Sequence, residues 1–401
     1  MGKYVITRFK YKEKDILFYG IKNESGFYRI SLDTPDNSDL IGNVYVGYVK
    51  DIVKNIDAAF IEYQDGKTGY FSINDNKNPV FLNKKNTDKI CQGDLVLVQI
   101  SKNAIKTKFP VLTSNISLTG KYCVLNYNKT GIGFSGKIKD QNFKSEVRDN
   151  LSNLLKDDRY SFGVIIRTNA TTARLVDIES EITELKQKMT EILSKSEYRT
   201  KYSILHNEPK DYLTWIKGFY KNEVSEIVTD NRDLYENISD YMEKTNIEIS
   251  LNLYEDDLLP LYKLHSIEKT LNDTLNKKVW LKSGAYLYIE QTEAMVVIDV
   301  NTGKCIKGNN SKKHILNVNI EAAKEIALQL SLRNLSGIII IDFINMSSEE
   351  DKVILIDKVK EYILKDKIKT DYIEMTKLDL VELTRKKTKA SLVEQYEKVI
   401  N

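Results

Sequence analysis

Two aspartates each follow a run of apolar residues in the last third of the sequence. Asp299 follows the run 294–298, and Asp342 follows the run 338–341, 43 residues further along the chain. A helix pattern at 319–333 lies between them, so the two runs are predicted to be neighbouring parallel strands joined by a crossover helix. Sites in open α/β sheets lie outside the carboxyl ends of the strands, and we therefore expect the two carboxylates to lie close together.

A pair of carboxylates favours metal chemistry. Two like charges repel by roughly 1–4 kcal/mol at ~4 Å, and a divalent cation removes that repulsion. Mg²⁺ is commonly held by one or two carboxylates together with waters and substrate phosphate, so two aspartates are sufficient. Turn capping is the competing interpretation, because an aspartate at a strand end often begins a turn. The residues alone leave both interpretations open.

Arg167 and Thr168 form a second candidate site, directly after the apolar run 163–166. A guanidinium can bind a phosphate through two hydrogen bonds, and a hydroxyl supplies a further donor. An ordinary surface arginine is the competing interpretation. The segment 131–136 has the form G-x-G-x-x-G, but no helix follows it at once, so a dinucleotide site is not expected.

Composition and charge narrow the class of protein. A chain of 401 residues is too long for one typical core. Lys and Arg number 60 against 57 acidic residues, a net charge of +3, so a nucleic-acid surface would have to be a local patch. Cys91, Cys123 and Cys305 form no C-x-x-C pair, so neither a disulfide framework nor structural zinc is expected. Without a signal-peptide pattern or a long apolar run, a cytoplasmic protein is expected.

Secondary-structure patterns indicate several structural units. Strand patterns at 4–7, 15–19 and 27–30 are followed by a second group that is typical of a small β-barrel, at 44–49, 58–63, 69–73 and 95–100. The next part combines strands at 121–126 and 162–167 with helices at 143–155 and about 175–192. After 211, apolar strands alternate with helices and predict a layered α/β unit with a buried sheet, with elements at 297–300, 319–333, 338–343, 349–365 and 372–375.

The sequence resembles the ribonuclease E/G family over about residues 1–390. The stretches 289–303, 319–335 and 337–344 carry the resemblance, with the motifs Ile298-Asp299-Val300-Asn301-Thr302-Gly303 and Ile341-Asp342-Phe343-Ile344. In that family the two aspartates bind one Mg²⁺ and the asparagine supports them. The resemblance therefore implies Asp299, Asp342 and Asn301 as catalytic residues, with Asp299 and Asp342 holding Mg²⁺ or Mn²⁺. Asn345 replaces the family's usual last aspartate and is assigned no ligand role.

The same resemblance implies RNA-contacting residues. The segments 42–47 and 57–63 are similar to the family's OB-fold barrel of ribosomal S1 type, a barrel class that binds single strands. Phe60, Tyr70 and Lys108 stand at the family's RNA contacts. Without the resemblance, Phe60 and Tyr70 would be interpreted as core aromatics.

A third group corresponds to the family's sensor of a 5′-monophosphate end. Arg167 and Thr168 stand at its phosphate contacts. The segment 117–125 matches the stretch that contacts the terminal nucleotide, which implies Gly120 and Val124. Lys369 stands where some members have an RNA-contacting arginine.

The implied fold is multi-domain α/β. An RNase H-like scaffold at 1–38 and 211–278 carries an inserted S1-type OB-fold barrel at 39–119 and a 5′-sensor unit at 120–210. A DNase I-like catalytic unit follows at 279–401.

The implied activity is Mg-dependent endoribonuclease cleavage of single-stranded, AU-rich RNA in RNA processing and mRNA decay. It leaves a 5′-phosphate and a 3′-hydroxyl and prefers 5′-monophosphorylated RNA. No zinc is expected, because the family's C-x-x-C link is missing, and a monomer or dimer is expected rather than a zinc-linked tetramer. A non-catalytic single-strand RNA-binding protein and a DNA nuclease are the alternatives.

Overall fold

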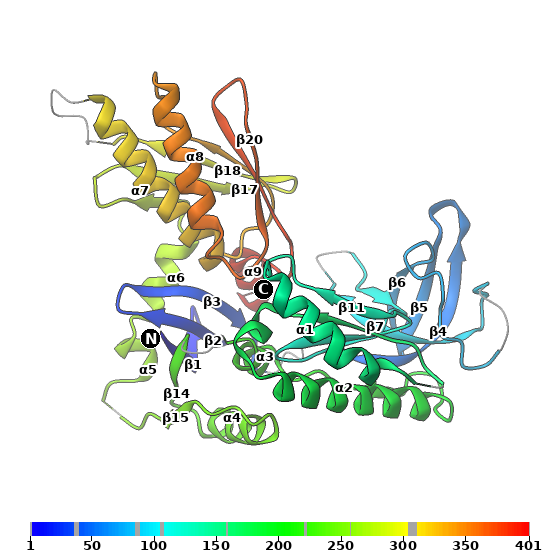
Figure 1. Cartoon of the computed structure of the whole chain (residues 1–401). Helices are drawn as coiled ribbons and strands as arrows, with labels where there is room; N and C mark the ends of the chain where they lie inside the picture. The colour runs from blue at the N-terminus through cyan, green and yellow to red at the C-terminus, as the bar shows by residue number, and fades with distance from the viewer. Residues whose placement is uncertain are drawn as a thin grey trace. The chain divides into compact units, whose positions relative to one another are not determined.

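A computed structural model gives the fold of the chain (Figure 1). The residues that it describes are 2–35, 40–84, 89–104, 108–157, 159–219, 223–256, 258–303 and 311–400. They form two compact units, one of Met1–Asn37 with Asn222–Asn401 and the other of Ser38–Lys221. No helix in these ranges is long and apolar enough to cross a membrane.

The first unit begins with a five-stranded sheet in the order β15-β14-β1-β2-β3. Its first three strands form an antiparallel meander, and β14 and β15 then extend the sheet in parallel beyond β1. The strands are β1 (Gly2–Tyr11), β2 (Lys14–Asn23), β3 (Gly26–Asp33), β14 (Val224–Thr229) and β15 (Ser250–Leu253). The accompanying helices are α4 (Arg232–Lys244), α5 (Leu261–Leu264), α6 (Ile267–Leu275) and α9 (Leu392–Ile400).

A second sheet of the same unit has six strands in the order β16-β17-β18-β19-β21-β20. Only β18 and β19 are parallel, and α7 connects them. The elements are β16 (Lys278–Trp280), β17 (Tyr286–Gln291), β18 (Met295–Asn301), α7 (Ser311–Leu332), β19 (Gly337–Asp342), α8 (Glu349–Ile363), β20 (Thr370–Met375) and β21 (Leu380–Arg385). The two adjacent parallel strands predicted from the sequence are therefore confirmed.

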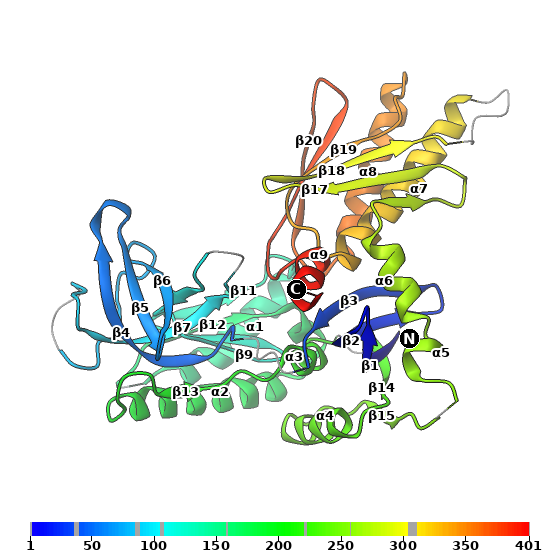
Figure 2. The same ribbon diagram turned by 180° about the vertical axis from the view of Figure 1, so that it is seen from behind.

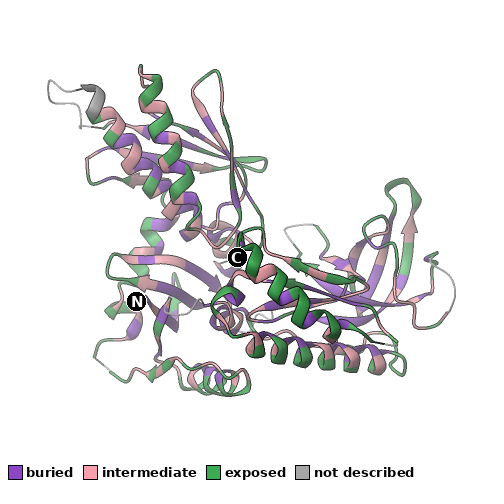
Figure 3. Cartoon of the chain, in the orientation of Figure 1, coloured by how far each residue is buried: buried purple, intermediate pink, exposed green. Residues whose placement is uncertain are grey.

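The core of this second sheet lies on one face only. Residues 296, 298 and 300 of β18 are buried with apolar residues of α7 and α8, whereas 295, 297 and 299 are exposed. Both helices pack on the same face, as Figures 1 and 2 show from opposite sides. The prediction of a buried sheet is wrong for the face opposite the helices: Ile338, inside the most apolar run, is 49% exposed. Figure 3 shows buried and exposed residues on the helices of this unit.

Helix α8 begins where its sequence requires. The hydroxyl of Ser348 accepts a hydrogen bond from the backbone N–H of Asp351, which caps the first turn. Glu349, Glu350 and Asp351 occupy that turn, where carboxylates are favoured by the helix dipole.

The second unit contains a closed barrel. Strands β4, β5, β6, β8 and β7 pair in a ring that closes between β4 and β7, and β13 adds to β4. The small barrel predicted from the strand patterns is confirmed. Its strands are β4 (Val44–Val53), β5 (Ala58–Gln64), β6 (Lys67–Ser72), β7 (Leu95–Lys102), β8 (Val111–Thr113) and β13 (Ile204–His206), with a 3₁₀ turn η1 at Lys54–Ile56.

A four-stranded sheet in the order β11-β12-β10-β9 lies in the same unit. The buried residues of α2, among them Ile178, Ile182 and Met189, pack against it, so one side of this helix is a packing face. The elements are β9 (Ser117–Thr119), β10 (Cys123–Tyr127), β11 (Gly131–Phe134), α1 (Gln141–Leu151), η2 (Ser152–Leu155), β12 (Phe162–Ile166), η3 (Thr168–Thr172), α2 (Leu175–Ser196) and α3 (Asp211–Lys217).

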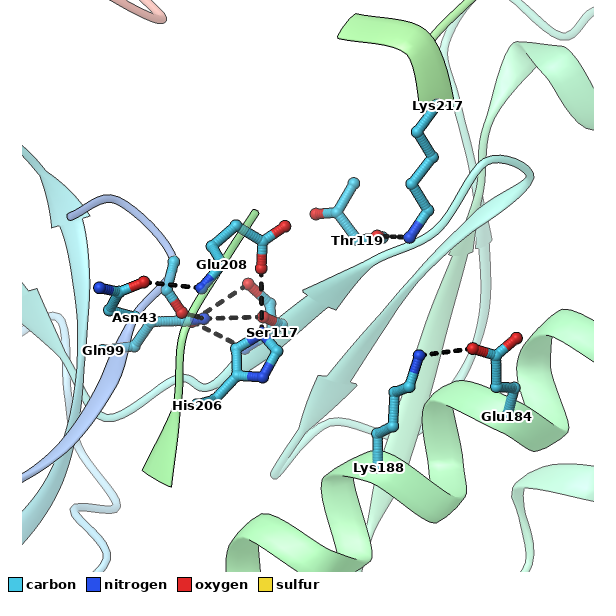
Figure 4. A network of polar contacts seen from close by, with 10 residues as sticks. Asn43, Gln99, Ser117, Thr119, Glu184, Lys188, His206, Glu208 and Lys217 are labelled. Carbon is cyan, nitrogen blue, oxygen red and sulfur yellow. Dashed lines mark hydrogen bonds and ion pairs between the residues drawn. The ribbon is translucent and has the colours of Figure 1, made fainter. Parts of the chain in front are cut away.

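A polar network joins the barrel to this sheet (Figure 4). The side chain of Gln99 in β7 donates to the carbonyl of Ser117 at 2.8 Å and accepts from the backbone N–H of Ser117 at 2.9 Å. Asn43 accepts from the backbone N–H of Glu208 at 2.7 Å. Lys217 donates to the carbonyl of Thr119 at 2.7 Å. Because these donors and acceptors are satisfied between elements, the barrel and the sheet form one compact unit.

Arg385 is the buried cation that holds β21 in the second sheet of the first unit. Its side chain is 1% exposed and its Nε donates to Asp366 at 2.7 Å. Its Nη1 donates to the side chain of Asn334 at 3.0 Å and to the carbonyl of Leu335 at 2.7 Å. Arg385→Ala leaves a carboxylate and two acceptors without this donor, a loss of ~3–5 kcal/mol. Calorimetry should show an unfolding midpoint roughly 10 °C lower.

The matched control is Arg159→Ala in the second unit. Arg159 pairs with Glu197, but the two side chains are 59% and 41% exposed, so solvent screens the pair. The midpoint of this variant should stay close to that of the wild type. Equal losses in both variants would contradict the importance of the buried Arg385 contacts.

Candidate active site

Asp299 and Asp342 stand side by side at the ends of two adjacent strands. β18 and β19 pair in parallel from Met295↔Ile338 to Asp299↔Asp342 without a shift in register. Side chains of paired residues point to the same face of a sheet. Both aspartates are exposed, on the face opposite α7 and α8. The structure therefore brings together the two carboxylates that the sequence predicted would be neighbours.

Asn301 orients one of these carboxylates. Its Nδ2 donates a hydrogen bond of 2.6 Å to Oδ2 of Asp299. The chain turns directly after it, at Gly303, which has φ +58 and could not carry a Cβ because that atom would lie 2.3 Å from the carbonyl oxygen of Gly284. Glycine is therefore required at this turn.

Asn319 positions the chain after the second aspartate and was not identified as a site residue from the sequence. It is fully buried on α7. Its Nδ2 donates to the carbonyl of Ile344 at 2.8 Å, and its Oδ1 accepts from the backbone N–H of Ile344 at 3.1 Å. The two bonds fix the backbone two residues beyond Asp342. Its burial and its partner 25 residues away are not visible in the sequence.

The electrostatics of the pair suit a cation. Asp342 is exposed as a residue, but partial desolvation of its carboxyl group, and then the charge of Asp299, raise its pKa above the ordinary value. A divalent cation between the carboxylates would reverse that penalty. Among the residues that the structure describes, no group of three or more His, Cys, Asp or Glu side chains could hold a metal. Two carboxylates, together with water and phosphate oxygens, form a ligand set that Mg²⁺ commonly has in proteins.

Phe60 and Tyr70 form a cross-strand pair on the barrel. They are register partners in β5 and β6, their ring centroids lie 6.2 Å apart, and both side chains are partly exposed. Neither belongs to the barrel's buried core. Phe109, 51% exposed, adds a third ring 5.4 Å from Phe60, and the exposed Lys108 precedes it in the chain. Phe109 was missed from the sequence, where its exposure could not be known.

The four-stranded sheet of the second unit carries four of the predicted residues in or beside its strands: Gly120, Val124, Arg167 and Thr168. Nη1 of Arg167 donates to the carbonyl of Gly120 at 2.5 Å. The hydroxyl of Thr168 donates to Oγ of Ser135 at 3.3 Å, and Val124 pairs with Ile165 across β10 and β12. Ser135 belongs to the segment 131–136, whose G-x-G-x-x-G pattern was not expected to form a dinucleotide site and suggested no other role. Ser135 directly follows β11, which runs parallel to β12, and its hydroxyl therefore lies beside Thr168.

Glu181 shapes the loop at Gly120. Its carboxylate accepts from the backbone N–H groups of Lys121, Tyr122 and Cys123, the last two at 2.7 and 3.0 Å. A Cβ on Gly120 would lie 2.3 Å from that carboxyl carbon, so a larger residue there would push the Glu181 carboxylate away from its backbone partners. Glu181 is a further residue that sequence reasoning missed, because its partners are backbone atoms 58–60 residues away.

Lys369 lies in the first unit, directly before β20. Its side chain is exposed and pairs with Asp371 at 2.9 Å. The structure therefore places it on a different unit from the other four residues of the expected 5′-end group.

Comparison with known proteins identifies relatives over almost the whole chain. A family model described as Ribonuclease E/G family matches residues 117–388. Ribonuclease G of Haemophilus influenzae is 31% identical over 385 residues, covering 92% of this chain and 77% of that protein. Ribonuclease G of Escherichia coli K12 is 30% identical over 375 residues, covering 90% and 76%. Ribonuclease E of a Nostoc species is 32% identical over 365 residues, covering 89% and 52%.

The proximity of Asp299 predicts how the pKa of Asp342 should respond to a substitution. In metal-free protein, Asp299→Asn removes the negative charge beside Asp342, so the pKa of Asp342 should fall while the part due to burial remains. Ionisation of a carboxyl group with a raised pKa lowers the stability of the folded protein as the pH rises through that pKa. Because the pKa of Asp342 is raised less in this variant, the variant should be more stable than the wild type at neutral pH. NMR titration of the Asp342 carboxyl tests the shift. Asp357→Asn, on the exposed face of α8, is the control; an unchanged pKa in Asp299→Asn would show that the pair does not interact.

Proposed function

The chain belongs to the ribonuclease E/G family and is an endoribonuclease, and from that premise we propose that it cuts single-stranded RNA with a divalent cation held by Asp299 and Asp342. One observation carries the proposal: the two aspartates are register partners at the ends of parallel strands within the part of the chain that the family model matches. Mg²⁺ is the expected ion and Mn²⁺ an alternative, since both accept oxygen ligands.

The residues around the pair each have a role in the proposed mechanism. Asn301 holds the Asp299 carboxylate in one orientation, and Asn319 holds the backbone that follows Asp342. When bound, Mg²⁺ supplies an activated water and stabilises negative charge on the phosphate. The exposure of both aspartates leaves room for a backbone phosphate to approach them. Products with a 5′-phosphate and a 3′-hydroxyl are expected.

The barrel is proposed to hold the RNA strand. Phe60 and Tyr70 offer partly exposed rings, on which bases stack whatever their sequence, and Lys108 offers a charge for the phosphates. Single strands fit this arrangement because their bases are free to stack. We extend the proposal to AU-rich transcripts, whose strands pair weakly, in RNA processing and mRNA decay.

The architecture fits finer assignments that belong to the same proposal. The meander β1–β3 extended in parallel by β14 and β15 would be the RNase H-like scaffold, and the sheet carrying both aspartates the DNase I-like catalytic unit. A zinc-linked assembly is not part of the proposal. A monomer or a dimer is proposed instead.

The four-stranded sheet β11-β12-β10-β9 is proposed to bind a 5′-monophosphate. Arg167 and Thr168 would supply donors, and the loop at Gly120 and Val124 would contact the first nucleotide. The carbonyl of Gly120 and the hydroxyl of Ser135 hold the arginine and threonine in place. Lys369, paired with Asp371, is proposed as an auxiliary cation for the RNA backbone.

Cleavage should require both carboxylates. Asp299→Asn or Asp342→Asn should abolish cutting of a labelled single-stranded RNA in Mg²⁺ buffer, because each change removes one of two charged ligands. Binding of the same RNA should remain within about twofold, since phosphate and stacking contacts elsewhere are unchanged. Gel assays of cleavage and of binding test both statements.

The control for these variants is Asp357→Asn, which alters an exposed aspartate on α8 and should keep full activity. Matched DNA and RNA strands in the same assay separate a ribonuclease from a deoxyribonuclease. Full activity in either active-site variant would overturn the two-aspartate site.

The 5′ end of the RNA should control the rate. Below saturation, RNA with a 5′-monophosphate should be cut roughly tenfold to a hundredfold faster than RNA with a 5′-hydroxyl, the value of a charge-assisted contact of ~1.5–3 kcal/mol. A 5′-triphosphate should also be disfavoured. Arg167→Ala should remove the preference without changing the rate on 5′-hydroxyl RNA, while the exposed Arg199→Ala should keep it. Equal rates for both RNAs with the wild type would contradict the sensor.

A further inference from the structure

At the edge of the second sheet, a partly exposed cluster is formed by Lys278, Trp280 and Tyr286. Trp280 is 63% exposed, and its ring centroid lies 5.3 Å from that of Tyr286, at an interplanar angle of 61°. The Lys278 ammonium lies 4.1 Å from the Trp280 centroid and 3.7 Å from the Tyr286 centroid. The exposed ring of Trp280 thus stands beside a partly exposed cation and a partly exposed second ring.

Strand register connects this cluster to the two aspartates. Lys278 pairs with Tyr288, Tyr288 with Asp299, and Asp299 with Asp342, which makes one row across four strands. The next row runs from Trp280 through Tyr286 to Asn301. Residues in register share a face, and neighbouring strands lie ~4.8 Å apart, so Trp280 stands ~10 Å from Asn301 on the face that carries the carboxylates.

Packing does not account for the cluster. The buried residues of these strands, such as Leu287, Ile289 and Ile298, face α7 and α8 on the other side of the sheet. Among the described residues, no carboxylate forms an ion pair with Lys278. A tryptophan this exposed adds little to folding, so its surroundings point to a ligand with flat faces and negative charge.

We propose that Lys278, Trp280 and Tyr286 bind one nucleotide of the RNA substrate beside the phosphate to be cut. The base would stack on the open side of Trp280, and the ammonium of Lys278 would meet the neighbouring phosphate. This inference rests on the proposed function, and it assigns to the catalytic unit a base-binding subsite separate from the barrel. Because every base has a π face, the subsite accepts any base.

A single-stranded nucleic acid is the occupant that the charges favour. The cluster offers a cation rather than an apolar patch alone. The rows of paired residues connect it to the two carboxylates that are proposed to hold the cation at the phosphate. A second copy of this chain is the competing occupant, and the test includes it.

Tryptophan fluorescence gives a direct test, because the chain has only two tryptophans. Trp215 is 6% exposed, whereas Trp280 is open to solvent. Single-stranded RNA titrated in EDTA, where cleavage is prevented, should quench the emission of the wild type and of Trp215→Phe. Trp280→Phe should show no comparable quenching. Quenching that persists in Trp280→Phe, or is absent in the wild type, would overturn the proposal.

Affinity and kinetics supply a second readout. Trp280→Ala should weaken binding of single-stranded RNA about tenfold and raise KM with little change in kcat, whereas Trp280→Phe should recover most of the affinity. Tyr198→Ala, which removes an 86% exposed ring from the second unit, should bind like the wild type. Wild-type affinity in Trp280→Ala would contradict the subsite.

Two further outcomes separate this proposal from its premises. If Trp280→Ala lowers the molecular mass measured by light scattering, the face is an interface between copies and the proposal fails. If the wild type is quenched by RNA but does not cut it in Mg²⁺, the subsite stands and the catalytic assignment fails.

Discussion

The register between β18 and β19 is the constraint on which the rest of the site depends. Backbone hydrogen bonds along five paired positions hold Asp299 beside Asp342 although their charges repel. The sheet core beneath them, packed against α7 and α8, provides the free energy that maintains this arrangement. Desolvation of the Asp342 carboxyl group, and then the charge of Asp299, raise the pKa of Asp342. The proposed cation, which would remove the repulsion, would therefore bind to a site that folding has already assembled.

The placement of both helices on one face has a second consequence. It leaves the opposite face of the sheet available, so the carboxylates, Asn301 and the aromatic cluster at Trp280 can share one surface. Asn319 shows how the covered face supports the open one: a buried amide on α7 fixes the backbone just after Asp342. The second unit has its own polar framework, in which Gln99 and Glu181 satisfy the backbone of the segment at 117–123.

Much of this arrangement could be predicted from local patterns. Apolar runs ending in aspartate, with a helix between them, were sufficient for the neighbouring strands, and regularly spaced short strands were sufficient for the barrel. The prediction of a buried sheet was wrong, because the apolar run 338–341 does not show that α7 and α8 both pack on the same face. Ser135, Glu181 and Asn319 were missed for another reason: their partners are distant in sequence and are mostly backbone atoms. Trp280 could not be linked to Asp299 until the register of three strands was known.

Anomalous scattering from a crystal soaked in Mn²⁺ would test the central claim most directly. A single strong peak in contact with carboxylate oxygens of both Asp299 and Asp342 is the predicted result, and the peak should vanish in crystals of Asp299→Asn. The account would be contradicted if protein that is active in Mn²⁺ showed no peak at this pair, or bound the ion only elsewhere.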